Sequence, residues 1–278
     1  MTTVALFGAG GKMGVRLASN LMRSPYSVLP IEVSPEGRER LMDETGLECV
    51  SQDEALASAE VVILAVPDRL IGTILASFVD ELAPGTAVIM LDAAAPSSGR
   101  LPDREDITYF VSHPCHPPIF SDETDPEAQT DYFGGFKAKQ HIICALQQGP
   151  EEHYQMCEDV ARAFYQPVMN AHRCTVDQMV ILEPALSESV GATFAMMLAE
   201  ATREATRRGV PQQAAEDFLL GHLSILLAVS FEILPGARLS EGCMVAIEEA
   251  TPRIFHDDWL ERVFDPDAIR ASVESICT

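Results

Sequence analysis

The stretch VALFGAGGKMG, residues 4–14, joins an apolar run to four glycines and leads into an amphipathic helical pattern. A strand, a glycine-rich turn and a helix in this order are typical of the dinucleotide-binding fingerprint G-x-G-x-x-G. Counted from Gly8, the third glycine falls one residue late. Two alignments remain open: Ala9 replaces the first glycine and Gly11 and Gly14 follow it, or the turn is one residue wider than the template.

In either alignment the backbone N–H groups at the start of the helix would face a coenzyme pyrophosphate, and the helix dipole favours an anion there. We therefore expect a phosphate-binding turn made by Gly10, Gly11, Lys12, Met13 and Gly14. The alternative is a plain βα turn with no ligand.

Two further features fit a nucleotide site. Glu32 ends the second apolar run, 18 residues after Gly14, where an acid accepts hydrogen bonds from the adenosine ribose. A carboxylate there repels a 2′-phosphate, so NAD is favoured over NADP. The segment ILAVPD, 63–68, ends the next buried strand with Pro67 and Asp68, which we expect on the nicotinamide side of the coenzyme.

Composition excludes several classes of protein. The 278 residues carry a formal net charge of −23, which repels nucleic acid and anionic lipid headgroups. An acidic substrate therefore needs local positive charge, and Lys137 and Lys139 form the one close lysine pair. There is no apolar run long enough for a membrane span and no basic leader. Seven scattered cysteines, with no C-x-x-C, predict reduced thiols in the cytoplasm.

The order of apolar runs predicts an α/β fold. Strands alternate with helical patterns, as in a Rossmann-type, mostly parallel sheet, over an NAD-binding domain at 1–172. An all-helical domain for substrate binding and dimerisation is expected at 173–278. The strands are expected at 3–7, 28–33, 61–66, 86–91, 107–111, 141–146 and 163–169.

Three residues are candidates for catalysis. His113 and His116 lie in SHPCHPPIF, just after a strand, and histidine suits proton removal or metal ligation near neutral pH. Glu183 interrupts the apolar helix MVILEPALSES, which should be buried, and a buried carboxylate needs a partner or a ligand. Pro184 should kink that helix and free a backbone carbonyl. The plain alternatives are a bland turn and a structural ion pair.

Several motifs give the chain a family resemblance. The glycine turn, AVPD and the helical second half resemble the 6-phosphogluconate dehydrogenase-like and ketol-acid reductoisomerase-like superfamily. More narrowly, HPCHPPIF, DETDPEA, DYFGGFKAKQHI, QGPEEHY and ILEPALSES resemble the D-apionate oxidoisomerase family. The resemblance runs from residue 2 to about residue 233.

The resemblance implies an NAD-dependent oxidation coupled to a skeletal shift of a branched sugar acid. Apionate would lose a hydride from C2, a base would take the proton of the C3 hydroxyl, and a hydroxymethyl group would move from C3 to C2, giving 3-oxo-isoapionate. This shift needs the C2 ketone polarised by a metal ion or by acid donors. His113, His116 and Glu183 would supply bases or ligands, and a divalent metal is possible; such a set would suit zinc or manganese better than the magnesium of reductoisomerases.

Two other functions stay open. A hydroxy-acid or prephenate-type dehydrogenase would use NAD without rearrangement, and an NAD-sensing binding protein would not turn over at all. The apolar helices at 175–233 carry more apolar surface than a small domain can hide, which predicts a homodimer through the helical domain.

Overall fold

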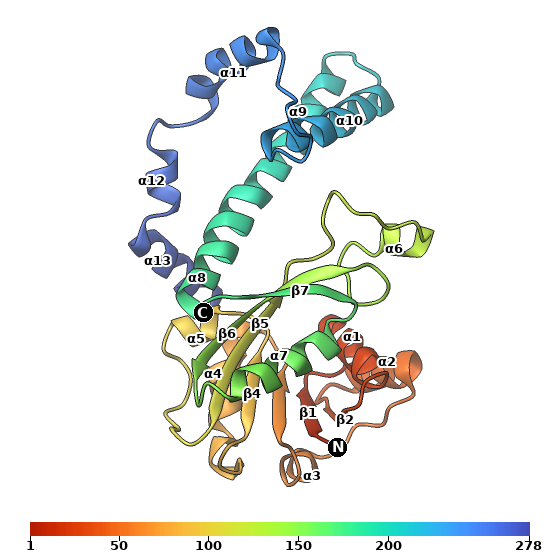
Figure 1. Ribbon diagram of the computed structural model, residues 1–278, viewed down its shortest axis with the longest axis vertical. Helices are drawn as coiled ribbons and strands as arrows, with labels where there is room; N and C mark the ends of the chain where they lie inside the picture. The colour runs from red at the N-terminus through yellow and green to blue at the C-terminus, as the bar shows by residue number, and fades with distance from the viewer. The chain divides into compact units, whose positions relative to one another are not determined.

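The computed structural model describes all residues from 1 to 278 and divides the chain into two compact units (Figure 1). The first unit comprises 1–181 together with 270–278, and the second comprises 182–269. The predicted boundary after residue 172 therefore differs from the observed one. The segment 173–181 and the last nine residues pack with the α/β part because their apolar side chains are buried there.

The first unit is built on one seven-stranded sheet of order β2-β1-β3-β4-β5-β6-β7. All neighbouring strands are parallel except β5 and β6, which run antiparallel. The strands are β1 (Thr3–Phe7), β2 (Ser27–Ile31), β3 (Val61–Leu64), β4 (Ala87–Met90), β5 (Thr108–Pro114), β6 (Gln140–Gln148) and β7 (Val168–Arg173). The predicted mostly parallel sheet is confirmed.

The interior strands are apolar on both faces because helices cover both sides of the sheet. Every residue of β3 and β4 is buried. Pro30 lies in β2, at the edge of the sheet, where a missing N–H removes no ladder bond on the outer side.

Three helices cover one face of the sheet: α1 (Lys12–Leu21), α2 (Pro35–Thr45) and α7 (His153–Phe164). Their buried side chains, among them Leu17, Leu41 and Phe164, form one core with Leu6 and Phe110 of the sheet. On the other face lie α4 (Asp68–Ala76), α5 (Ala94–Ser97) and α8 (Val176–Val180). There Phe7 of β1 stacks on Phe78, at 4.7 Å between ring centroids.

Short elements complete this unit. They are α3 (Gln52–Leu56), η1 (Val79–Glu81), α6 (Pro126–Thr130) and the end of α13 (Pro266–Ile276). The C-terminal turn returns to the α/β part, where the carbonyl of Cys277 accepts a hydrogen bond from Arg100 at 2.9 Å and Val273 is buried.

The second unit is helical throughout. It contains most of the π-helical segment η2 (Ile181–Ala192), then α9 (Thr193–Arg207), α10 (Gln212–Ser230), α11 (Glu241–Ile254), α12 (Trp259–Val263) and the start of α13. Pro184 lies inside η2. The segment around Pro184 is π-helical, with a wider turn than an α-helix, and the Ser189 hydroxyl donates to the Pro184 carbonyl at 2.7 Å.

The helical unit leaves its apolar side chains open. No residue of α9, α10 or α11 is buried, and Phe218 and Phe231 are 69% and 71% exposed. The expectation that the helix beginning at residue 175 is buried is correct for part of it: Val176, Met179, Val180, Pro184 and Ala185 are buried. Leu186, in η2, is exposed within one chain.

The last predicted strand begins too early, although its final two residues lie in β7. The apolar run 163–169 was expected to form a strand, but Ala163 and Phe164 are the last residues of α7, and β7 begins at Val168. Phe164 is fully buried as the end of the amphipathic face of that helix, so its apolar character comes from helix packing. No helix of the chain is both long enough and apolar enough to span a membrane.

Candidate functional site: a coenzyme cleft and a histidine pair

The glycine-rich turn connects β1 to α1, and Gly11 is the residue that caps the helix. Gly8 has φ +72°, a conformation that side chains disfavour, and a Cβ there would lie 2.3 Å from the carbonyl oxygen of Ala65. A Cβ on Gly14 would lie 2.0 Å from the carbonyl oxygen of Gly8. Gly8, Gly11 and Gly14 thus make the tight turn, the helix start and the close helix–strand contact, so the turn is one residue wider than the template.

Glu32 lies directly after β2 and faces the same turn. Its carboxylate accepts hydrogen bonds from the N–H of Gly10 at 3.0 Å, Val33 at 2.8 Å and Ser34 at 2.9 Å. These bonds fix the carboxylate at the carboxyl edge of the sheet, beside the glycine turn. This is where an acid that binds a ribose diol is needed.

A cavity of about 330 Å³ lies at the ends of β1, β2 and β3. The sheet order reverses direction at β1, so this is the topological switch point where α/β sheets bind ligands. It is lined by Phe7, Gly8, Gly11, Ile31, Glu32, Val33, Gln52, Ala65, Val66, Pro67, Leu70, Ile74 and Ser77. A glycine cradle, a fixed carboxylate and an open cleft fit an adenine dinucleotide.

The predicted coenzyme residues do not all line this cleft. Gly11, Glu32 and Pro67 do, and Gly10 lies beside it through its bond to Glu32. Asp68 is the first residue of α4, directly after Pro67. Lys12 and Met13 line a different cavity, of about 380 Å³, between α1, α2 and the 133–136 turn.

His113 is the penultimate residue of β5, beside the end of β4. Its Nδ1 lies 2.8 Å from the carbonyl oxygen of Leu91 and 3.8 Å from a carboxylate oxygen of Asp92. Asp92 itself accepts a hydrogen bond from the N–H of Ala94 at 2.6 Å, at the start of α5. Burial lowers the pKa of His113, and the Leu91 carbonyl and the Asp92 charge, which raise it, offset this only in part.

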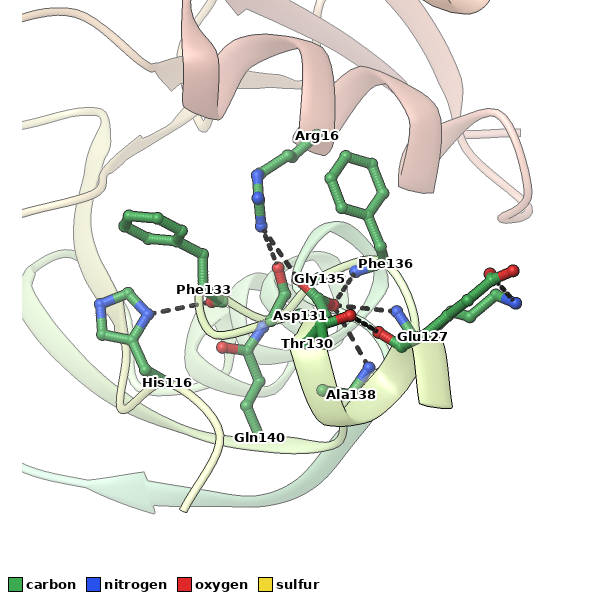
Figure 2. A network of polar contacts seen from close by, with 12 residues as sticks. Arg16, His116, Glu127, Thr130, Asp131, Phe133, Gly135, Phe136, Ala138 and Gln140 are labelled. Atoms are coloured by element: carbon green, nitrogen blue, oxygen red, sulfur yellow. Dashed lines mark hydrogen bonds and ion pairs between the residues drawn. The ribbon is translucent and has the colours of Figure 1, made fainter. Parts of the chain in front are cut away.

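His116 follows in the loop after β5, and its ring lies edge-on to that of His113 at 6.4 Å between centroids. It has φ +59°, which is unusual for a residue with a side chain. Its Nδ1 lies 2.9 Å from the carbonyl oxygen of Phe133, as Figure 2 shows. The structure therefore brings the two predicted histidines together.

Both histidines are fixed by a backbone carbonyl. A carbonyl oxygen only accepts, so Nδ1 of each ring must carry a hydrogen, and in the neutral form of such a ring Nε2 carries the lone pair. The lone pair of Nε2 can accept a proton or bind a metal ion. Two imidazoles in the same tautomer thus stand at the carboxyl edge of the sheet.

Glu183 lies in the first turn of η2, in the second unit, and is partly buried. Within the first unit, α8 ends at Val180 and packs on α5, the helix that follows Asp92. Glu183 thus follows the end of α8 by three residues, and α8 is packed against the helix that begins beside Asp92.

The lysine pair is engaged elsewhere. Lys137 forms ion pairs with Asp125 and Glu127, and Lys139 pairs with Asp122 at 3.2 Å. They act as exposed edge charges, which is the plainer of the two readings for this pair.

Sequence reasoning missed part of the coenzyme cleft and the supports of both histidines. Gln52 and Ser77 line the cleft from α3 and from the end of α4. Leu91 and Phe133 act through their backbone carbonyls, which any residue possesses. The sequence carries no signal for such contacts.

Family models match two parts of the chain. Residues 3–96 match the model "NADP oxidoreductase coenzyme F420-dependent", and residues 121–277 match "Phosphogluconate dehydrogenase (decarboxylating) C-term". The first match covers the glycine turn and the coenzyme cleft. The second covers more than half of the chain, including the helical unit.

Several relatives match this chain over nearly its full length. A D-apionate oxidoisomerase from Cupriavidus necator is 58% identical over 98% of both chains. One from Rhizobium rhizogenes is 54% identical over 99% of this chain and 100% of its own. The crystal structure of a semialdehyde dehydrogenase NAD-binding protein from Cupriavidus necator, in complex with calcium and NAD, matches with a TM-score of 0.97 at 57% identity, covering 99% of each chain. The chain belongs to the D-apionate oxidoisomerase family.

Proposed function

We propose that the protein is an NAD-dependent oxidoisomerase that converts D-apionate to 3-oxo-isoapionate. The observation that carries this proposal is the pair His113 and His116, fixed in one tautomer at the same sheet edge as a nucleotide cleft. An oxidation followed by a shift needs two proton transfers, and the site offers two bases. Relatives named for this activity support the proposal.

NAD is the hydride acceptor when it is bound. The turn Gly10–Gly14 would hold its pyrophosphate, with Lys12 and Met13 at the helix start, and Glu32 would bind the adenosine ribose. Pro67 and Asp68 would border the nicotinamide half, because they follow β3 at the switch point.

His113 serves the oxidation at C2. Its neutral Nε2 takes the proton of the C2 hydroxyl as the hydride leaves, and Asp92, 3.8 Å from Nδ1, stabilises the resulting imidazolium. The imidazolium then donates to the oxygen of the new ketone. This polarises C2 and makes it the acceptor for a migrating carbon.

His116 serves the shift. Its Nε2 takes the proton of the C3 hydroxyl, the C3–C bond to a hydroxymethyl group breaks, and the same electron pair forms the new bond at C2. C3 becomes the ketone, and His113 returns its proton to the oxygen at C2. The sum is the loss of one hydride and one proton, so atoms and charge balance.

Glu183 is the third catalytic candidate of the proposal. It follows α8 along the chain, and α8 packs on α5, the helix that follows Asp92. Lys137 and Lys139 are paired with acids, so they are not the groups that recognise the substrate carboxylate in this proposal.

A divalent cation is the second way to polarise the C2 ketone. Asp92, His113 and Glu183 have the side chains that ligate a metal, and the hydrogen bond from Nδ1 to Leu91 orients His113 as metal-binding imidazoles are oriented. The calcium in the Cupriavidus necator crystal structure favours this candidate. A cation held there would act as a Lewis acid on the ketone.

Product analysis tests the function. Purified protein is incubated with NAD and D-apionate while the absorbance of reduced coenzyme is followed, and the product is analysed by carbon NMR. The expected result is NADH formation with a ketone at C3 of a rearranged skeleton. A retained skeleton would identify a simple hydroxy-acid dehydrogenase, and binding of NAD without turnover would identify a sensor.

Two substitutions test the division of labour. His113→Gln is expected to lower the rate of NADH formation by roughly 10²–10⁴-fold, the usual effect of losing a general base. His116→Gln is expected to allow oxidation and slow the shift, so that the unrearranged 2-keto acid accumulates. His153→Gln is the control. His153 is the first residue of α7, its Nδ1 lies 2.7 Å from the hydroxyl of Thr108 in β5, and it has no role in the proposed mechanism. Equal losses in His113→Gln and His116→Gln would overturn the division.

Chelation separates the metal route from the acid route. The protein is treated with EDTA, dialysed and assayed, and then zinc, manganese, magnesium or calcium is restored. Lost activity that one metal restores supports the metal route. Full activity of metal-free protein, checked by elemental analysis, supports the imidazolium as the donor.

The partner in this proposal is a second copy of the chain. α9 and α10 pack together, and beside their contact lies an apolar hollow of about 430 Å³ lined by Ala201, Ala205, Val210 and Phe218. An exposed apolar surface of this kind marks a protein interface. A monomer in light scattering at micromolar concentration would contradict the homodimer.

The cysteines favour a reducing compartment such as the cytoplasm. All seven are unpaired, and burial raises the pKa of Cys144 and of Cys157 to about 12, which keeps both thiols protonated. Thiol titration of protein freshly released from its cells is expected to find all seven thiols free; an intramolecular disulfide would contradict this.

A further inference from the structure

Asp131 organises the turn that follows α6. One of its carboxylate oxygens accepts hydrogen bonds from three successive backbone N–H groups, those of Phe136 at 3.1 Å, Lys137 at 3.0 Å and Ala138 at 3.3 Å. These bonds lower the pKa of Asp131 despite its partial burial, which acts in the opposite direction. The ionised carboxylate therefore determines the path of the chain from residue 131 to residue 138.

Arg16 of α1 joins this turn to the coenzyme helix. Its guanidinium pairs with the other oxygen of Asp131 at 3.5 Å and donates to the carbonyl of Gly134. The same group lies over the rings of Phe136, at 4.4 Å, and Phe133, at 5.3 Å (Figure 2). Charge, hydrogen bond and ring contacts thus hold Phe133 in one place.

A second contact ties the same turn to α1. Asn20, fully buried one turn further along the helix, donates to the carbonyl of Gly135 at 2.7 Å and to that of Phe164 at 3.0 Å. Asn20 fixes the base of the turn to the core. Arg16 fixes its tip, where the carbonyl of Phe133 meets His116.

We infer that Arg16 is a positioning residue for His116, acting through Asp131 and the carbonyl of Phe133. His116 has a left-handed backbone conformation, which a residue with a side chain disfavours, so contacts with surrounding residues must hold it there. The bond of Nδ1 to the Phe133 carbonyl sets both the ring orientation and the tautomer. Arg16 holds the turn that presents this carbonyl, through its ion pair with Asp131, its bond to the neighbouring Gly134 carbonyl and its contact with the Phe133 ring. The inference rests on the proposed role of His116 as the base of the shift.

The inference has a structural consequence for the reaction. Arg16 lies one helical turn after Lys12, so the helix that carries the phosphate turn also carries the support of His116. The phosphate turn and the support of His116 therefore both belong to α1, which fixes the coenzyme and the base of the shift relative to each other. A general base loses rate steeply with small displacements, so loosening this link should reduce turnover rather than coenzyme binding.

Four variants test the inference. Arg16→Gln removes the charge, and Arg16→Lys keeps the charge but loses the planar fork and ring contacts. Asp131→Asn removes the ion pair with Arg16 while leaving an oxygen for the backbone N–H groups. Arg173→Gln is the matched control, because Arg173 also pairs with a carboxylate, Glu151, and lies 4.1 Å over a ring, that of Tyr154, with no contact to the 131–138 turn.

The first readout needs no substrate. Long-range ¹H–¹⁵N correlation spectra of histidine-labelled protein distinguish the two tautomers, and the spectrum of His116→Gln assigns the signal. The wild type is expected to show His116 with the hydrogen on Nδ1. Arg16→Gln is expected to show both tautomers, Arg16→Lys an intermediate pattern, and Arg173→Gln the wild-type pattern.

The second readout is the split between kcat and KM. Arg16→Gln is expected to lower kcat for the rearranged product by roughly 10-fold, with the KM for NAD unchanged and a melting temperature like that of Arg173→Gln. A wild-type tautomer in Arg16→Gln, or equal losses in Arg16→Gln and Arg173→Gln, would overturn the inference. Failure of the wild type to rearrange D-apionate refutes the proposed function alone, because the tautomer is measured without substrate.

Discussion

The α/β unit and the helical unit bury their apolar side chains to very different extents. β3 and β4 are buried at every position, and three helices pack on them to form one core. In the helical unit, α9, α10 and α11 contain no buried residue, although α10 is rich in Leu, Ile, Phe and Val. The coenzyme cleft thus rests on a structure that one chain completes, whereas the helices need cover from outside it.

This difference has a thermodynamic reading. Burial of apolar surface contributes about 25 cal/mol per Å², and isolated helices are marginal in water without it. Phe218 and Leu220 of α10 are 69% and 67% exposed in one chain, so most of their burial is still available for an interface. Substitutions that act on one unit alone can therefore test whether the two units differ as described.

The largest effect is expected from charges placed on α10. The double variant Phe218→Glu with Leu220→Glu would put two carboxylates into the proposed interface, at a cost of several kcal/mol, roughly a 1000-fold or greater loss of dimer affinity. Sedimentation should show monomers with reduced helical content, while NAD still binds to the α/β unit.

Gln213→Glu, in the first turn of the same helix, is the control and should stay dimeric, because a negative charge near a helix N-terminus is tolerated. Wild-type dimerisation of the double variant would show that α10 is not the interface. Loss of NAD binding along with the dimer would show that the two units are not independent.

A smaller effect, confined to the other unit, is expected from Gly14→Ala. The added Cβ would lie 2.0 Å from the carbonyl oxygen of Gly8, so α1 must move away from β1. Overpacking of this kind costs about 1–3 kcal/mol, and NAD affinity should fall by roughly 10- to 100-fold. Calorimetry measures both, and dimerisation should be unaffected.

Gly242→Ala, in α11, is the matched control. No atom lies within 4 Å of the Cβ it would add, and alanine favours a helix, so stability should be unchanged or slightly higher. Undiminished NAD affinity in Gly14→Ala would mean that the close contact of α1 with β1 is not required for coenzyme binding.

The same contrast explains what the sequence could predict. β1 was predicted at its observed bounds, and β3 and β4 to within two residues, because strands buried on both faces have continuous apolar runs. The run ending at Phe164 looks the same in composition, yet it belongs to an amphipathic helix. The antiparallel direction of β6 depends on its pairing with β5, a long-range contact that local pattern does not encode.

The candidate site divides in the same way. Glu32 and the glycines were predictable because their chemistry needs particular residue types at fixed spacing. The histidines were predictable as candidates only. Their common tautomer depends on the carbonyls of Leu91 and Phe133, and the second of these depends on Arg16, 117 residues before Phe133.

A moderate effect on coenzyme choice is expected from Glu32→Gln. The amide can still accept from Gly10 but no longer repels a 2′-phosphate or binds the ribose with a full charge. A hydrogen bond to a charged group contributes about 1.5–3 kcal/mol, so the preference for NAD over NADP should fall by roughly 10-fold or more. The ratio of kcat/KM for the two coenzymes measures it.

Glu36→Gln, on the exposed first turn of α2, removes the same charge four residues away and should leave the ratio unchanged. An unchanged ratio in Glu32→Gln as well would show that the selectivity for NAD comes from other residues of the cleft.

The smallest effect is expected in the pH dependence of stability, and it tests the role of the Asp131 carboxylate in the α/β unit. Asp131 has a pKa below its ordinary value in the folded chain, since three backbone N–H groups and Arg16 favour the ionised form. Its contribution is therefore fully present above about pH 4, the pKa range of an unfolded aspartate, and is lost as the pH falls through the lower folded pKa.

Asp131→Asn should melt a few degrees lower than the wild type near neutral pH, and the difference should shrink as the pH falls below about 4. Asp43→Asn, on α2, is the control for the loss of one exposed negative charge. A difference for Asp131→Asn that stays constant from pH 7 to pH 3 would show that the carboxylate acts by shape alone. The 131–138 turn would then be held by packing, and the link from Arg16 to His116 would not depend on charge.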